Sequence, residues 1–435
     1  MTWPAFTRSI TIFIMLTSDV RKLFQRETQG LGHRESGRYN LAALEVFDQL
    51  AFPGDEVETA EPLKYARAEL LELASWQDDQ VRQVFGLDGG SSRTMTFRNG
   101  TTACANQAIL ICEQGMTVEG VPLEAFRTLS WVSHNRDYRT VSGAHAETHE
   151  RVTLWRLQLS NDEIPATANL QRIQEVVKAM ADVASEPQHA VRMAKRLNLG
   201  AGDLVFLDGR FYPTRLYRYL ISGMGRGADV DIDLLGKGEW KQLIQSSLEI
   251  VHLALERGVL FVAINKTPES SALLRFGADK RSKGLWHNDR QWISALFEKI
   301  PQGHLGYTSW FIQSLHPALQ GGSMEAMDLF QELSDELMLK LPASAYHIAF
   351  FYVYDPRVSA ALRVELPRLL LERYGAERLR LLALSHIARG KGGVPNAIRI
   401  ADAQAHITQE ERQALQLQSG LTPDWDFNHS RGAPR

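Results

Sequence analysis

An α/β fold with a mixed sheet is predicted for this chain by two buried-strand signals and the helices that precede them. Asp203–Gly209 is an apolar run closed by a carboxylate and a glycine, and Val259–Ile264 is a second apolar run. Helical patterns precede them at Pro187–Leu197 and Trp240–Arg257. Helices that alternate with strands in this way form crossover connections, which indicates an α/β sheet.

Shorter patterns predict the remaining elements of this part of the chain. Further strands are expected at Thr94–Phe97, Ala103–Cys112, Arg151–Leu159, Tyr346–Tyr354 and Ala361–Leu366. A helix is expected at Ala168–Val183, and a closing helix at Thr408–Gln418 begins with a capping-box sequence. Sheet and helices thus extend over most of the chain.

The first ninety residues favour a helical extension. After Pro62, apolar residues recur at helical spacing as far as Phe85, and acidic residues occupy the other positions. Leu87–Ser91, rich in glycine, is a strong break. We therefore expect a helical N-terminal extension at 1–90, the main domain at 91–415 and a flexible tail at 416–435.

Composition excludes several classes of protein. Of the 435 residues, 44% are hydrophobic and 23% are charged, so wholesale disorder is excluded, and a net charge of -3 excludes a uniformly basic nucleic-acid binder. Two cysteines, Cys104 and Cys112, cannot form a disulfide framework, which favours a reducing, cytoplasmic compartment. The apolar stretch Ser9–Leu16 is too short to span a membrane, and Met15 is favoured over Met1 as the start of translation.

Three common catalytic patterns are absent or incomplete. No Gly-x-x-x-x-Gly-Lys-Ser/Thr loop accompanies the strand that ends at Asp208, so ATP hydrolysis is not expected. His145 and His149 have the spacing of a zinc helix, but the glutamate does not directly follow the first histidine. No Gly-x-Ser-x-Gly elbow occurs. The strongest chemical candidate is Asp208 itself, where a buried strand meets solvent and Gly209 allows close approach. Such an aspartate suits a two-metal phosphodiesterase site.

Five segments, in order, resemble the NurA family of DNA-end nucleases, which act from 5′ to 3′ with a hexameric HerA-type translocase. The segments lie within residues 92–415, and they are Met95–Thr101, Leu204–Gly209, Gly258–Thr267, Leu362–Pro367 and Gly393–Asp402. The resemblance implies an RNase H-like core, a homodimer, DNA as substrate, and Mn²⁺ or Mg²⁺ at a two-metal site. It is compatible with either DNA end repair or anti-phage defence.

The residues carried over from the family depart from its pattern at several positions. Asn99 stands where the opening Asp-Gly-Ser has its aspartate, and the glutamate expected before the second strand falls near His189, with Glu186 the nearest carboxylate. Val394 and Asp402 stand where the last motif has tyrosine and histidine. The implied metal ligands are Asp208, Asn99, Glu186, His189 and Asp402, and the implied catalytic residues are Asp208, Asp402 and Lys266, which would neutralise phosphate charge.

Two interpretations follow from these departures. A rearranged site would keep metal-dependent nuclease activity, because Asp402 restores the charge that Asn99 lacks. A decayed site would leave a NurA-like subunit that binds DNA and the ATPase without cleaving. A metal-free phosphate-ester binding protein unrelated to DNA is a third interpretation. Basic residues support DNA contact in either of the first two cases, and the expected contacts are Arg210, Lys266, Arg281, Lys283, Arg363 and Lys391.

Overall fold

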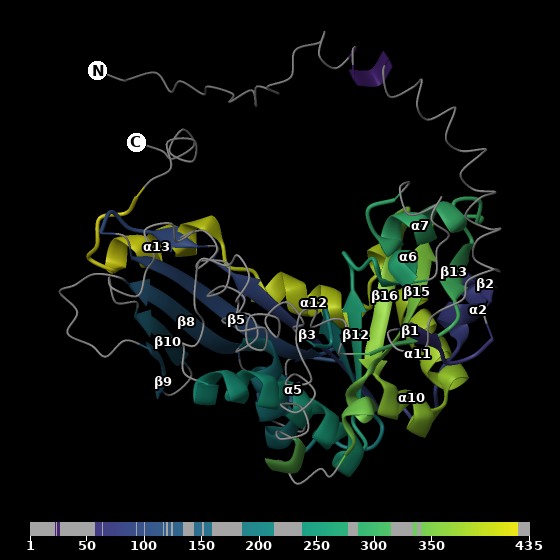
Figure 1. The fold of residues 1–435 in the computed structure, drawn as a ribbon, viewed down its shortest axis with the longest axis horizontal. Helices are drawn as coiled ribbons and strands as arrows, with labels where there is room; N and C mark the ends of the chain where they lie inside the picture. The colour runs from purple at the N-terminus through teal and green to yellow at the C-terminus, as the bar shows by residue number, and fades with distance from the viewer. Residues whose placement is uncertain are drawn as a thin grey trace, which may run out of the picture.

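The predicted α/β architecture is confirmed: one large mixed sheet has helices packed around it (Figure 1). The computed structural model describes residues 22, 24–26, 57–158 with short gaps, 185–212, 237–276, 286–314, 334–336 and 341–424. The main path of the sheet runs β1-β14-β15-β16-β12-β11-β3-β5-β8-β10-β9. Two short strands, β6 (Thr117–Val118) and β7 (Val121–Pro122), pair separately.

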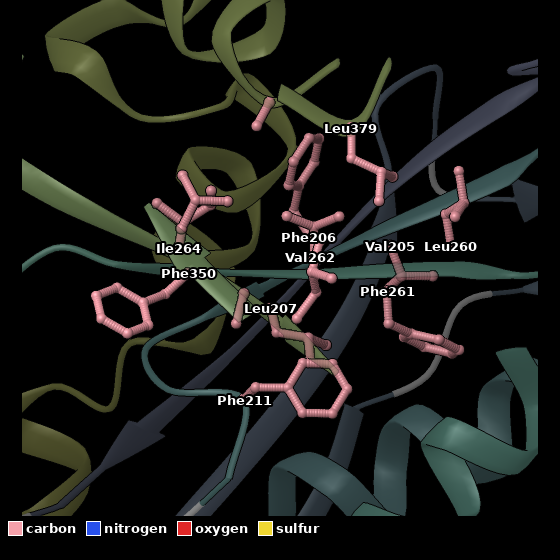
Figure 2. Packing of buried hydrophobic residues seen from close by; sticks show 14 of the residues in the cluster. Val205, Phe206, Leu207, Phe211, Leu260, Phe261, Val262, Ile264, Phe350 and Leu379 are labelled. Carbon is pink, nitrogen blue, oxygen red and sulfur yellow. The ribbon is translucent and has the colours of Figure 1, made fainter. Parts of the chain in front are cut away.

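Three parallel strands form the centre of this sheet. They are β3 (Gln83–Ser91), β11 (Asp203–Asp208) and β12 (Leu260–Asn265). The strand β11 lies between the other two, and every residue of β12 is buried. Strands covered on both faces need apolar side chains on both, which explains their continuous apolar runs. Figure 2 shows the resulting core, where Val205, Phe206 and Leu207 of β11 lie among side chains of β12.

Two antiparallel wings flank this centre. On the β12 side lie β16 (Ala360–Pro367), β15 (Ile348–Asp355), β14 (Phe311–Gln313), β1 (Val57–Thr59), β13 (His304–Thr308) and β2 (Tyr65–Glu69). On the β3 side lie β5 (Thr102–Cys112), β4 (Met95–Thr96), β8 (Ala125–Ser133), β10 (Val152–Gln158) and β9 (Gly143–His149). Only the β8–β10 pair in these described wings is parallel.

Helices cover the sheet and close its ends. They are α2 (Leu70–Ser75), α5 (Lys237–Arg257), α6 (Ala272–Phe276), α7 (Asp289–Leu296), α10 (Arg368–Tyr374), α11 (Ala376–Arg389), α12 (Asn396–Ala405) and α13 (Gln409–Gln418). Residues 185–196 are also helical, and 3₁₀ turns occur at Ala343–Tyr346 and Lys391–Gly393. The helix α12 packs along β3 and β5, while α7 packs on β15 and β16. No helix within the described ranges is long and apolar enough to cross a membrane.

The expected helix after Pro62 is wrong. The chain there forms β2, the short helix α2 and β3, and all the strands described between residues 57 and 91 belong to the large sheet. Val84 and Phe85 are apolar because β3 is buried between β11 and β5, and the same residues happened to fit a helical period. Burial in the sheet therefore overrode the local pattern.

Most other predicted elements are confirmed within a residue or two. The strands expected at 203–209, 259–264, 346–354 and 361–366 are β11, β12, β15 and β16, and α13 carries the predicted capping box between Thr408 and Glu411. The helix expected at 168–183 lies outside the described residues. In the segment proposed as a flexible tail, the Thr422 carbonyl accepts the N–H of Arg98, and Asp424 donates its N–H to the Thr96 carbonyl of β4. Thr422 and Asp424 are thus held against the β4 segment. The division at residues 90 and 415 stays a prediction.

Candidate active site

Charged residues come together where the parallel pairing of β3, β11 and β12 ends. Asp208 is the last residue of β11, and Lys266 directly follows β12. Leu87 of β3 is the register partner of Leu207, so the next residue, Asp88, lies beside Asp208 on the neighbouring strand, which is about 4.8 Å away. In α/β sheets, ligands bind outside the carboxyl ends of parallel strands. This edge is therefore the candidate site.

Asp208 and Lys266 form an ion pair across this edge. Lys266 Nζ lies 2.7 Å from Asp208 Oδ2, with side-chain exposures of 32% and 18%. The backbone after Asp208 turns away through Gly209, whose φ of 93° suits glycine, and the Gly209 N–H donates to the Ile264 carbonyl at 3.0 Å. The strand end is thus fixed to β12, with both charged groups open to solvent.

Asp88 is the most perturbed acid of the site. Its side chain is 6% exposed, and its Oδ1 accepts the Gly89 N–H at 2.7 Å. Burial raises the pKa of Asp88 to about 8, helped by the charges of Asp208 and Asp402 and opposed by that of Lys266. A carboxyl that is this crowded by other carboxylates gains from a nearby cation.

Glu186 approaches the same strand end from the opposite face of β3. A Cβ on Gly89 would lie 2.2 Å from Glu186 Oε1, so the carboxylate occupies the space that a side chain at this position would need. Because successive strand residues face opposite sides, Gly89 faces away from Asp88. Glu186, near the start of the helical segment 185–196, therefore brings a further carboxylate to the Asp88–Gly89 position.

The helix α12 brings Asp402 over the other face. Cβ atoms on Gly86 and Gly90 would lie 2.2 Å from the Ala397 backbone and 1.7 Å from the Ala405 carbonyl oxygen, so these two glycines let the helix lie directly on β3. Gly86, Asp88 and Gly90 share that face. Asp402, exposed on α12, acts electrostatically on both Asp88 and Lys266.

The donor set fits a hard divalent cation, although the ligands are not gathered around one point. Burial lowers the pKa of Lys266, but the charges of Asp208, Asp88 and Asp402 together raise it above its usual value. Lys266 is therefore the cation that this acidic edge already holds. In the part of the chain that the structure describes, no three acidic, histidine or cysteine side chains lie close enough to hold a metal ion as they stand. Carboxylate oxygens are nevertheless what Mg²⁺ and Mn²⁺ prefer.

Asn99 does not lie at this edge. It is exposed in the turn between β4 and β5, where its Oδ1 accepts the Thr101 N–H at 3.1 Å. Asp88 pairs with Ile109 of β5, and from Ile109 to Thr102 that strand runs roughly 23 Å at about 3.3 Å per residue. The turn instead contacts residues 422–424. The structure thus separates Asn99 from Asp208, whereas Asp88 lies beside Asp208.

Arg363 does not reach the surface, which corrects its prediction as a DNA contact. It is 3% exposed because β16 lies inside the sheet between β12 and β15, and it pairs with Glu365. His189 is 1% exposed on the 185–196 helix. Arg210, two residues after Asp208, and Lys391 are exposed, while Arg281 and Lys283 lie outside the described residues.

Sequence reasoning missed Asp88, although a signal was present. Val84–Leu87 is an apolar run closed by Asp88 and Gly89, the same pattern that identified Asp208. The following Gly90 and Ser91 are typical of a loop, and the apolar residues upstream fitted a helical period, so no strand was predicted there. Asp88-Gly89-Gly90-Ser91 also matches an Asp-Gly-Ser strand end more fully than Arg98-Asn99-Gly100-Thr101 does.

One family model matches most of the chain. A family model described as NurA domain matches residues 82–407. The sequence comparison with curated proteins finds no match. Among solved structures, the chain is similar to the NurA nuclease from Sulfolobus solfataricus, with 12% identity, a TM-score of 0.47 and coverage of 92% of this chain and 96% of that chain. It is also similar to a NurA with manganese, with 11% identity, a TM-score of 0.43 and coverage of 92% of this chain and 97% of that chain. A NurA bound to dAMP and manganese gives 10% identity, a TM-score of 0.41 and coverage of 94% of this chain and 98% of that chain.

Proposed function

Since this chain belongs to the NurA family, whose model covers residues 82–407, we propose that it is a metal-dependent nuclease that hydrolyses DNA from its ends. The observation that carries the proposal is the convergence of Asp88 and Asp208 with Asp402 and Lys266 at the ends of three parallel strands. Acids that crowd one another in this way are typical of sites that bind divalent cations and phosphodiesters.

The ligands that we propose are Asp88, Glu186, Asp208 and Asp402, with Asp88 replacing Asn99. Mn²⁺ or Mg²⁺, when bound, supplies Lewis-acid polarisation of the phosphodiester and ionisation of water near neutral pH. Asp88, with a pKa of about 8, holds a proton at neutral pH that must leave before both of its oxygens can act as ligands. Asp402 is exposed and therefore accessible to substrate.

Lys266 and Arg210 are proposed to hold the DNA backbone. The Lys266 ammonium is already at the edge and raised in pKa, so it stays charged while it binds a phosphate oxygen. Arg210 is exposed two residues after Asp208, and a guanidinium there can take a neighbouring phosphate with two N–H groups. Lys391, exposed between α11 and α12, would extend this contact.

Family membership extends the proposal to polarity and partners. We propose 5′ to 3′ processing with a hexameric HerA-type ATPase, and a homodimer as the working form. The cytoplasmic location is proposed from composition, in keeping with the two buried cysteines Cys104 and Cys112. Copurification with a HerA-type ATPase, and light scattering against the 49.0 kDa mass of one chain, test the two assemblies.

The nuclease proposal is tested by cleavage of a linear duplex labelled at its 5′ end, with Mn²⁺ or EDTA. We expect cleavage with Mn²⁺ only, and loss of cleavage in Asp208→Asn. Asp79→Asn, which changes an exposed acid of the α2–β3 connection, is the matched control and should cleave like the wild type. A wild type that binds DNA but stays inactive across the Mn²⁺ titration would favour the degenerate, DNA-binding subunit instead.

A further inference from the structure

A row of buried charges lies behind the turn that follows Asp208. Arg363 and Glu365, two residues apart on β16, are each 3% exposed, and Arg363 Nε lies 3.0 Å from Glu365 Oε1. Residues two apart on a strand face the same side. Replacing such a buried pair with apolar residues is often neutral or stabilising, so stability alone gives no reason for it.

Arg363 is held on every side. Its Nη2 donates to Gln313 Oε1 at 2.9 Å, and its guanidinium lies 3.8 Å from the centre of the Phe350 ring. Beyond it, the Tyr352 hydroxyl donates to Asp289 Oδ2 at 3.2 Å. Burial raises the pKa of Asp289 to about 6, while the Arg363 charge lowers it. Such a fixed guanidinium leaves Glu365 little freedom to turn.

The other oxygen of Glu365 reaches the candidate active site. Its Oε2 accepts the N–H of Phe211 at 3.1 Å, across 154 residues of sequence. Phe211 is 2% exposed, so this N–H has no access to bulk water. Together with the Gly209 N–H bond to the Ile264 carbonyl, this bond fixes the Asp208–Phe211 turn at two backbone positions.

We propose that Glu365 is a positioning residue: its carboxylate, oriented by Arg363, fixes the Asp208–Phe211 turn and thereby the Asp208 carboxylate and the exposed Arg210. The inference rests on the proposed nuclease function, because it concerns the same site. A carboxylate is the strongest acceptor available for a backbone N–H, and the Arg363 guanidinium, 3.0 Å away, holds it in place. Loss of the acceptor should therefore loosen the turn and weaken metal binding while the fold persists.

Two double variants separate positioning from stability. Arg363→Met/Glu365→Gln removes both charges and keeps a carbonyl that can accept the Phe211 N–H. Arg363→Met/Glu365→Met removes the same charges with similar volume and lacks that acceptor. The measurements are the melting temperature, hydrogen exchange of the Gly209 and Phe211 amides, Mn²⁺ affinity by calorimetry, and the kcat and KM of duplex cleavage.

We expect the two variants to melt within a few degrees of each other. The Gln variant should keep Phe211 amide protection, whereas the Met variant should exchange that amide about tenfold faster and bind Mn²⁺ about tenfold more weakly, the effect of one lost hydrogen bond to a buried group. Its kcat should fall and its KM should rise, because Asp208 and Arg210 both lose their fixed positions. Equal amide protection and equal Mn²⁺ affinity in the two variants would overturn the inference.

The wild type gives a test that needs no variant to fold. Its Phe211 amide should be protected as strongly as the amides of β12, and free exchange there would overturn the inference by itself. A wild type that protects this amide but binds no Mn²⁺ would overturn the proposed function and the inference with it. If the wild type binds Mn²⁺ but the two double variants do not differ in amide protection and Mn²⁺ affinity, only the inference is overturned.

Discussion

Asp88 lies beside Asp208 because each follows one member of a register pair, Leu87 on β3 and Leu207 on β11. Neighbouring parallel strands hold the two carboxyl groups at one edge without any loop to vary their spacing. The pKa of Asp88 rises to about 8, mainly through burial and next through the charge of Asp208. The pair is thus the structural centre of the candidate site, and it can be tested against the residue that sequence reasoning chose.

The first prediction compares Asp88→Asn with Asn99→Asp. Asp88→Asn removes a carboxylate from the edge, so Mn²⁺ affinity should fall and cleavage should drop about a hundredfold or more. Asn99→Asp adds a carboxylate in the β4–β5 turn, roughly 23 Å along β5 from the partner of Asp88, so both properties should stay unchanged. Calorimetry with Mn²⁺ and duplex cleavage measure the contrast. Higher activity in Asn99→Asp would instead indicate that Asn99 lies at the metal site.

The second prediction concerns the glycines of β3. Gly86→Ala would put Cβ 2.2 Å from the Ala397 backbone, which cannot move without lifting α12, so we expect a loss of about 2 kcal/mol or more. Gly89→Ala would meet only the end of the Glu186 side chain, which can swing away. That variant should keep nearly the wild-type melting temperature and bind Mn²⁺ more weakly. A Gly89→Ala protein with unchanged Mn²⁺ affinity would remove Glu186 from the ligand set.

Sequence reasoning succeeded where a segment is buried on both faces. The runs 204–207 of β11 and 260–264 of β12 are apolar throughout, and the helices before them carry an independent period, so two local signals agreed. It failed for β2 and β3, where partners distant in sequence decide the structure. Strand β2 alternates between half-buried and exposed residues and pairs only with β13 in the described sheet, which no local pattern reveals.

The site was predictable only in part for a related reason. Asp208 and Lys266 close recognisable strands, and the structure joins them in an ion pair. Asp88 precedes two glycines, a sequence that is typical of a loop. In the structure these glycines lie in β3, where the lack of a side chain leaves space for Glu186 at Gly89 and for α12 at Gly90. Arg363 looked like a surface cation because its sequence does not show that β16 is covered on both sides.

The third prediction is a pH dependence of stability that comes from His386 on α11. Its ring lies 5.0 Å from that of Phe206, and burial, then the charge of Arg389, lowers its pKa from 6.5 to about 3. Between these values the unfolded chain binds a proton that the folded chain does not. Stability from this group is therefore complete above pH 6.5 and falls as the pH drops toward 3.

At pH 5 the loss should reach about 2 kcal/mol, since each pH unit in this window is worth about 1.4 kcal/mol. His386→Leu should flatten the change in the free energy of unfolding between pH 7 and pH 5, measured by urea denaturation. His406→Gln, at the exposed end of α12, is the matched control and should keep the wild-type slope. A slope that His386→Leu leaves intact would assign the acid sensitivity to other groups.

The last prediction follows from the ion pair between Lys266 Nζ and Asp208 Oδ2, 2.7 Å apart. A metal ion that takes Asp208 as a ligand must draw that carboxylate away from the ammonium, so the lysine competes with the metal. Lys266→Met removes the competitor and keeps most of the side-chain length. Because a partly exposed pair is worth about 1 kcal/mol, Mn²⁺ should bind about fivefold more tightly. Cleavage should nevertheless fall about a hundredfold, because the phosphate loses its charge partner.

Lys195→Met is the matched control, since Lys195 pairs with Glu249 at 3.3 Å on the surface and neither residue belongs to the candidate site. Its Mn²⁺ affinity and cleavage should equal those of the wild type. The opposite signs of the two effects in Lys266→Met are the informative feature: general damage to the site would weaken metal binding and cleavage together. Weaker Mn²⁺ binding in Lys266→Met would mean that the lysine orients Asp208 for the metal and does not compete with it.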